Sequence, residues 1–173
     1  MMEHRCRYET ADGFSDIWMS SDGEALTGLW FEGSRDLSKH RFTCEERDLP
    51  VFCKTRRWLD IYFSGRQPDF TPRCRIDGLT PFRRKVVDAM LAIPFGETAT
   101  YGDIAAVFAK ERGIAKFSAR AVGGAVGWNP ICIIVPCHRV IGAGGRLTGY
   151  GGGMHNKIAL LRHEGCALSC LTA

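Results

Sequence analysis

The chain has 173 residues and a formal net charge of +4, with 45% hydrophobic and 24% charged residues. This composition is typical of a soluble globular protein with one or two domains. It excludes a transmembrane protein, because no run approaches the roughly 20 apolar residues that a membrane-spanning helix needs. Residues 1–5 lack the basic and apolar segments of a secretion signal, so we expect an intracellular protein, cytoplasmic or, in a eukaryote, nuclear.

The positive charge is concentrated in the second half of the chain. Residues 1–77 hold 12 Lys and Arg against 14 Asp and Glu, a charge of −2, whereas residues 78–173 hold 11 against 5, a charge of +6. This asymmetry indicates an anionic partner for the second half, although chance would explain it equally well. The eight Cys residues include no C-x-x-C pair, which argues against a zinc ribbon. In an intracellular protein we expect these thiols to be reduced.

The first half is predicted to form a small sheet with one helix. Residues 14–31 predict a β-hairpin, because two partly apolar runs flank a turn at 20–23 that contains Asp-Gly. A helix is predicted over 49–63, where apolar side chains recur at helical spacing after Pro50. Residues 67–78 carry two prolines and little periodicity, which predicts a linker.

The second half is predicted to be mainly helical. Apolar periodicity and N-cap residues predict four helices, over 81–92, 101–109, 118–127 and 155–163. The second of these begins with a capping box made by Thr100 and Asp103. Together with the third it forms a candidate helix-turn-helix. The fold class is therefore α/β (α+β), with an N-terminal α/β domain and linker at 1–77 and a mainly helical domain, which carries the candidate helix-turn-helix, at 78–173.

The predicted helix over 118–127 consists largely of small residues. It includes the adjacent Gly123 and Gly124, each of which costs about 1 kcal/mol inside a helix. Small side chains allow another backbone to approach closely, and such departures from local preference often mark function. That backbone would be either a sugar-phosphate chain or a neighbouring helix. From these residues alone, packing against a neighbouring helix is the favoured interpretation.

A possible nucleophile follows the apolar run at 131–135, which is predicted to be a buried strand. Cys137, His138 and Arg139 come directly after Pro136. Positive neighbours lower a cysteine pKa from about 8.5 to roughly 3.5–7.5, and a histidine can take the thiol proton. The alternative is a buried cysteine that serves only as a small hydrophobic side chain.

The surrounding motifs argue against that alternative. In chain order they are PFGE at 94–97, TYG at 100–102, RAVGGA at 120–125, NP at 129–130, IVPCHRVI at 134–141, LTGYGGG at 147–153 and LLRHEG at 160–165. This stretch, about residues 80–165, resembles the O6-alkylguanine-DNA alkyltransferase family. The combination is highly specific, whereas residues 1–77 share only the family's rough pattern of hairpin and helix.

The resemblance implies direct-reversal DNA repair. An alkyl group would pass irreversibly from O6-alkylguanine, or from O4-alkylthymine, in duplex DNA to Cys137, once per protein molecule. His138 would take the thiol proton through a water, and Glu164 would hold and polarise His138. Asn129 would brace the turn that presents Cys137. Tyr101 would press on a phosphate and donate a proton to the leaving base.

The resemblance also implies how DNA is bound. Arg120 would fill the space left by an extruded nucleotide, because a thiol cannot reach the O6 substituent inside a duplex. Ala121 and Gly124 would let the helix enter the narrow minor groove. Three residues would line the base pocket: Tyr150, Val140 and Cys132. Of these, Cys132 is better explained as filling the predicted strand.

We expect a monomer that binds double-stranded DNA, without a membrane association, a cofactor or a metal. His4, Cys6, His40 and Cys44 do not have the spacing of zinc ligands. The residues at 110–112 make the loop before the third helix longer than is usual in the family, and we interpret them as solvated.

Three other functions fit the sequence less well than alkyl transfer. A lesion-binding relative without repair activity would lack the nucleophile, whereas this chain has Cys137. A helix-turn-helix regulator would have no reason to carry Cys137 and His138 together with the distant Glu164. A cysteine hydrolase would need an oxyanion hole and would turn over.

Overall fold

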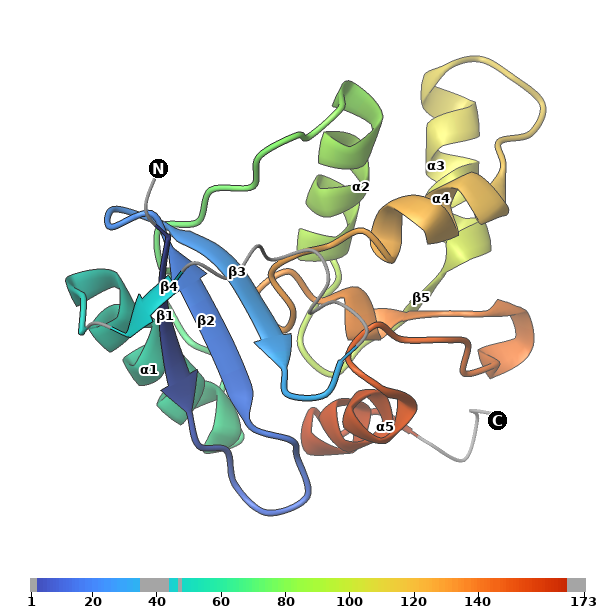
Figure 1. Cartoon of the computed structure of the whole chain (residues 1–173). Helices are drawn as coiled ribbons and strands as arrows, with labels where there is room; N and C mark the ends of the chain where they lie inside the picture. The colour runs from blue at the N-terminus through green and yellow to red at the C-terminus, as the bar shows by residue number, and fades with distance from the viewer. Residues whose placement is uncertain (1–2, 35–43, 47, 168–173) are drawn as a thin grey trace.

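The structure, a computed structural model, describes residues 3–34, 44–46 and 48–167 (Figure 1). A four-stranded sheet in the order β3-β2-β1-β4 forms the first part. The predicted hairpin is confirmed as β2 (Ile17–Ser21) and β3 (Leu26–Phe31), with an irregularity at the end of β2. β1 (Glu3–Tyr8) pairs antiparallel with β2, and β4 (Cys44–Glu46) pairs parallel with β1.

Helix α1 (Pro50–Phe63) packs beside this sheet, as predicted (Figure 1). Its buried side chains recur every three or four residues, so one face enters the core. They are Val51, Phe52, Thr55, Trp58, Leu59 and Tyr62. The last of these, near the C-terminal end of α1, points from the first half of the chain toward the site described below.

Residues 67–78 connect α1 to the helical half. Cys74 forms an isolated β-bridge with Leu26. The Leu26 amide donates to the Arg73 carbonyl and the Arg75 amide donates to the Leu26 carbonyl, each at 2.8 Å. The predicted linker therefore runs along the start of β3. The domain boundary between residues 77 and 78 stays a prediction. The two halves share one cluster of buried side chains.

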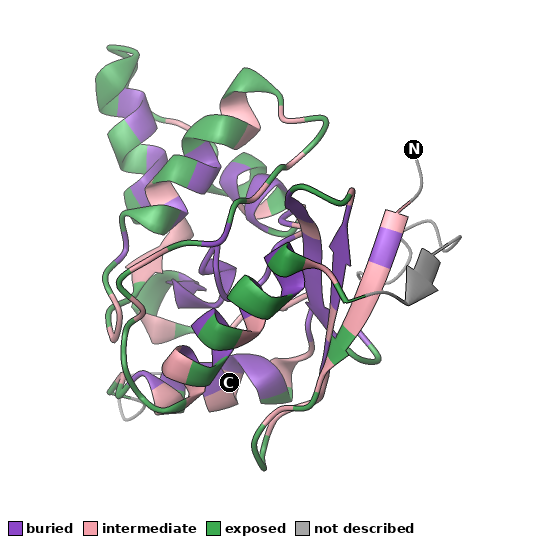
Figure 2. Ribbon diagram, turned by 90° about the vertical axis from the view of Figure 1, so that its left-hand side faces the viewer, coloured by how far each residue is buried: buried purple, intermediate pink, exposed green. Residues whose placement is uncertain are grey.

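The four predicted helices are present as α2 (Pro81–Leu91), α3 (Tyr101–Glu111), α4 (Ala119–Val126) and α5 (Met154–His163). The N-caps of α2, α3 and α4 accept backbone amides as expected: Thr80 from Arg83, Thr100 from Asp103, and Ser118 from Ala121. Helix α3 packs against α4. Buried and exposed residues alternate along α3, so one side of this helix faces the core (Figure 2). This pair forms the predicted helix-turn-helix.

The predicted strand over 131–135 is wrong. Ile131 makes only an isolated bridge to Leu29, at the edge of β3. The chain then turns sharply, because Ile133 adopts a left-handed conformation with φ of 67° and the Val135 amide bonds back to the Ile131 carbonyl at 3.1 Å. The run is apolar because it is buried, not because it is extended, and hydrophobicity alone does not distinguish the two.

A short parallel pair links the helix-turn-helix to the segment that follows this turn. β5 (Ala99–Thr100) pairs with β6 (Val140–Ile141), directly after the 3₁₀ turn η2 (Cys137–Arg139). The glycine-rich loop that follows contains a second such turn, η3 (Ala143–Gly145). Among the described residues, no helix has the length and apolar character required to cross a membrane.

Candidate active site

Cys137 lies at the start of η2, and only 6% of its surface is exposed. The side-chain amide of Asn129 donates to its sulfur at 3.1 Å and to the carbonyls of Ile131 and Val135 at 3.2 and 2.9 Å. The Asn129 carbonyl accepts the Ile131 amide at 3.1 Å. One buried side chain thus closes the turn and contacts the thiol that the turn presents.

The surroundings of Cys137 lower the pKa of its thiol from 9.0 to about 7. The largest contribution comes from a hydrogen bond with the Cys132 thiol, and the Asn129 amide, the Tyr150 hydroxyl and the Lys157 ammonium add to it. Burial acts in the opposite direction, because it disfavours a charged thiolate. At neutral pH a substantial fraction of Cys137 is therefore thiolate, the nucleophilic form.

His138 is completely buried and bonds to Glu164 through Nε2 at 2.7 Å. Burial lowers the pKa of His138, although the carboxylate acts against this change. A neutral imidazole whose Nε2 faces a carboxylate carries its proton there, so Nδ1 holds the free lone pair. Nδ1 is buried without a hydrogen-bond partner among the described residues, which leaves it available as a base.

Glu164, just after α5, accepts hydrogen bonds from four residues. His138, Arg139 and Tyr62 donate to Oε1 at 2.7, 3.0 and 2.7 Å, while Arg139 and the Gly96 amide donate to Oε2 at 2.8 and 3.2 Å. Burial alone would raise the pKa of Glu164, but the hydrogen bonds from His138, Arg139 and Tyr62 outweigh it and hold that pKa far below 4.5. Gly96 cannot be replaced, because a Cβ there would lie 2.8 Å from the Glu164 carbonyl.

Sequence reasoning missed three residues of this site: Arg139, Lys157 and Tyr62. Arg139 was visible next to His138, but its bidentate contact with Glu164 was not. Lys157 is fully buried, and its ammonium donates to the Val140 carbonyl at 2.7 Å. Burial lowers its pKa to about 8. The sequence did hold a signal for Lys157, because its spacing places this lysine on the same apolar face of α5 as Leu160 and Leu161.

Tyr101 and Tyr150 contact the glycine-rich loop and the site thiols, respectively. The Tyr101 hydroxyl, at the start of α3, accepts a hydrogen bond from Thr148 of the glycine-rich loop at 3.2 Å. Tyr150 is half-buried as a residue, and its hydroxyl is buried beside the Cys132 and Cys137 sulfurs. Burial makes the largest contribution and those sulfurs add to it, so that the pKa of Tyr150 is raised well above 10. Val140 is fully buried in the core.

Helix α4 presents the residues expected to meet DNA. Arg120, Ala121 and Gly124 are all exposed on it. A Cβ at Gly124 would meet no atom within 4 Å, whereas one at Gly123 would lie 3.7 Å from the Tyr101 ring, an ordinary contact. Packing within the protein therefore does not require a glycine at position 124.

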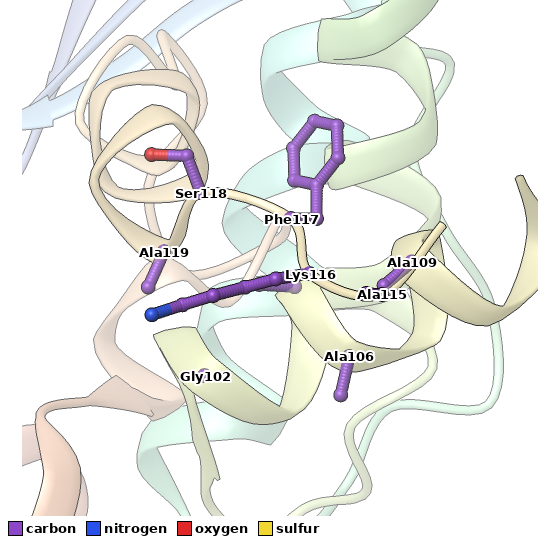
Figure 3. Close-up of a pocket in the computed structure, with 9 residues that line it drawn as sticks. Gly102, Ala106, Ala109, Ala115, Lys116, Phe117, Ser118 and Ala119 are labelled. Carbon is purple, nitrogen blue, oxygen red and sulfur yellow. The ribbon is translucent and has the colours of Figure 1, made fainter. Parts of the chain in front are cut away.

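A groove of about 650 Å³ lies between α3 and the segment that leads into α4 (Figure 3). Alanines of both segments form much of its wall, and Lys116 extends toward Ala119 at the start of α4 (Figure 3). Cys137 does not line it. The groove therefore belongs to the exposed surface of the helix-turn-helix.

The structure describes only some of the four His and Cys residues near a possible zinc position in the sequence, His4, Cys6, His40 and Cys44. His40 and the side chain of Cys44 lie outside the described residues. Among the side chains that are described, no group of three or more His, Cys, Asp or Glu is arranged to hold a metal. The absence of a metal and of any cofactor stays a prediction.

Fold and site together define a helix-turn-helix protein with an acidified, buried thiol. The family model "6-O-methylguanine DNA methyltransferase, DNA binding domain" matches residues 81–166. The methylated-DNA–protein-cysteine methyltransferase of Mycobacterium bovis is 42% identical over 159 residues, 91% of each chain. The protein of that name from Methanosarcina acetivorans is 49% identical over 150 residues, 86% of this chain and 91% of that one.

Among solved structures, Mycobacterium tuberculosis OGT in complex with DNA matches with a TM-score of 0.76 and 38% identity, covering 98% of this chain and 96% of that one. The chain belongs to the methylated-DNA–protein-cysteine methyltransferase family. The resemblance inferred from residues 80–165 is therefore confirmed, and the similarity extends over the first half as well.

Proposed function

We propose that this protein repairs alkylated DNA by moving the alkyl group of O6-alkylguanine onto Cys137. The observation that carries the proposal is the Cys137 thiol itself, which is buried, has a lowered pKa and is held by Asn129, with the hydrogen-bonded His138–Glu164 pair beginning at the next residue of the chain. A cysteine that served only to fill the core would have no need of a lowered pKa. The relatives bear the name of this activity.

The transfer is a displacement at the alkyl carbon. A bond forms between Sγ of Cys137 and that carbon while the carbon–O6 bond breaks, and its electrons stay with the base. The thiol proton passes to Nδ1 of His138 through a bridging water, and the resulting imidazolium is stabilised by Glu164. A donor at guanine N3, which we assign to Tyr101, lets the base leave neutral. The thioether is stable, so each molecule acts once.

Access to Cys137 requires the nucleotide to leave the duplex. The thiol is almost completely buried, and extrusion of a base costs a few kcal/mol, least for a damaged pair. We assign Arg120 to the space that the base leaves, and Ala121 and Gly124 to close contact with the minor-groove backbone. Tyr150 would line the base pocket, with Cys132 and Val140 behind it. Such a protein works in the compartment that holds DNA, the cytoplasm or, in a eukaryote, the nucleus.

The test is the intact mass of the protein after mixing with a duplex that carries one O6-methylguanine. We expect the mass of one methyl group per protein, located on Cys137 by peptide mapping and absent from Cys137→Ser. Tight binding to the duplex without a mass change would instead favour a lesion-binding protein. Steady release of product from simple esters, without modification of Cys137, would favour a hydrolase.

A further inference from the structure

Tyr62, a residue of the first half of the chain, bonds to a side chain of the candidate site. Its hydroxyl donates to Oε1 of Glu164 at 2.7 Å, across 102 positions of sequence. The side chain is 1% exposed. Neither the family motifs nor the sequence pattern of α1 assigns it any role beyond the core.

The position of the Tyr62 ring is fixed by packing. It stacks on Trp58 with centroids 5.5 Å apart and 8° between the planes, and it meets Phe95 edge to face at 5.9 Å. His163 bonds to the Tyr62 carbonyl through Nε2 at 2.7 Å, which ties the end of α1 to the end of α5. The hydroxyl is therefore aimed at the carboxylate by the fold and not by a mobile side chain.

We propose that Tyr62 is a positioning residue for alkyl transfer, which holds Oε1 of Glu164 against His138 and limits how strongly the carboxylate attracts the imidazole proton. This inference rests on the proposed function. Oε1 is shared by the Tyr62 hydroxyl, His138 and Arg139. Donors to one carboxylate oxygen compete for its charge, so each weakens the hold of the others. The first half of the chain would then contribute to the chemistry.

Tyr62 can act only as a donor here. Burial makes the largest contribution to the pKa of Tyr62, and together with the charge of Glu164 it raises that pKa well above 10. The phenol therefore keeps its proton at any working pH. The titratable and charged groups that face Tyr62, Glu164 and His138 come from three places. They are Arg139 of η2, Lys157 and His163 of α5, and Cys166 just after it.

The consequence concerns the protonation of His138. Without the Tyr62 hydroxyl, more of the carboxylate charge falls on His138, and its pKa rises. Because His138 must be neutral to accept the thiol proton, the acid limb of the transfer rate would then move to higher pH. The loss of a hydrogen bond to a charged group corresponds to a shift of about one pH unit and a rate loss of about tenfold below neutrality.

The experiment measures single-turnover methyl transfer from an O6-methylguanine duplex against pH for wild type, Tyr62→Phe and Trp58→Phe. The final amount of methylated protein gives the active fraction separately from the rate. We expect Tyr62→Phe to move the acid limb upward with unchanged affinity for an undamaged duplex. Trp58→Phe, which disturbs only the packing, should leave the limb in place.

A second variant tests the sign without risk to folding. Replacing Tyr62 alone by 3-fluorotyrosine makes the phenol a stronger donor of nearly the same shape, so the acid limb should move to lower pH. Equal profiles for wild type, Tyr62→Phe and the fluorinated protein would overturn the inference while leaving alkyl transfer intact. If wild type itself transferred no methyl group, the proposed function would fail first.

Discussion

The amide of Asn129 donates to Sγ of Cys137 at 3.1 Å while also holding the Ile131 and Val135 carbonyls of the turn that precedes it. The same side chain therefore holds the turn that presents the thiol and contributes to the low pKa of that thiol. Structure and reactivity are coupled at this point, and a change at Asn129 should be seen in both.

Asn129→Ala should destabilise the protein by about 2–4 kcal/mol, because it leaves buried backbone groups without partners. It should also raise the pKa of Cys137 above about 7, since a donor to the thiolate is lost. Denaturant unfolding and the pH dependence of thiol alkylation measure the two effects. Asn156→Ala removes a buried amide that bonds to Ser15 and Gly152 instead, so it should cost stability alone.

Cys132 should matter through its thiol and not only through its volume. The hydrogen bond with Cys132 makes the largest contribution to the low pKa of Cys137. Cys132→Ala should therefore move the midpoint of Cys137 alkylation from about 7 toward the ordinary 9.0. Cys132→Ser keeps a donor and should leave the midpoint near 7. If both variants behaved like wild type, Cys132 would only fill space.

Acid should remove the stabilisation that Glu164 contributes. Its pKa in the folded protein lies far below the ordinary 4.5, so its contribution is complete above about pH 4.5 and decreases as the pH falls below it. Glu164→Gln should cost about 3 kcal/mol at pH 7, because Arg139 loses a buried counter-charge. The difference from wild type should narrow between pH 5 and pH 3 in denaturant unfolding. Glu97→Gln, the same substitution at an exposed site, is the matched control.

Gly124→Ala should separate stability from DNA binding. A methyl group there meets no protein atom within 4 Å, and alanine favours a helix interior by about 1 kcal/mol over glycine. The variant should therefore unfold at a higher temperature than wild type. Its affinity for duplex DNA should fall, because the added methyl group keeps α4 from the backbone. Unchanged affinity in the more stable variant would remove Gly124 from the DNA contact.

Local signals predicted most of the secondary structure. The caps Thr80, Thr100 and Ser118 and the breakers near Gly65 predicted the helix boundaries to within two residues, because capping depends on neighbours in sequence. The prediction of a strand over 131–135 was wrong because the conformation of this segment depends on tertiary contacts. The conformation there is set by the side chain of Asn129 and by the bridge to Leu29, which no local pattern reveals.

The site was predictable where its residues are close together in a motif. Cys137 and His138 are adjacent, and the family resemblance supplied Glu164 and Asn129, which the structure brings into contact with them. Tyr62 was not predictable, because its partner is 102 residues away and its spacing in α1 is that of any core residue. Long-range polar contacts of this kind depend on the complete fold.

We expect Cys137 to accept one alkyl group and to keep it. The most direct measurement mixes the protein with a large excess of O6-methylguanine duplex and counts both the guanine restored and the methyl group on Cys137. We predict one of each per active protein molecule, with no further repair on prolonged incubation. More than one restored guanine per protein, or a methyl group on any residue other than Cys137, would contradict the account.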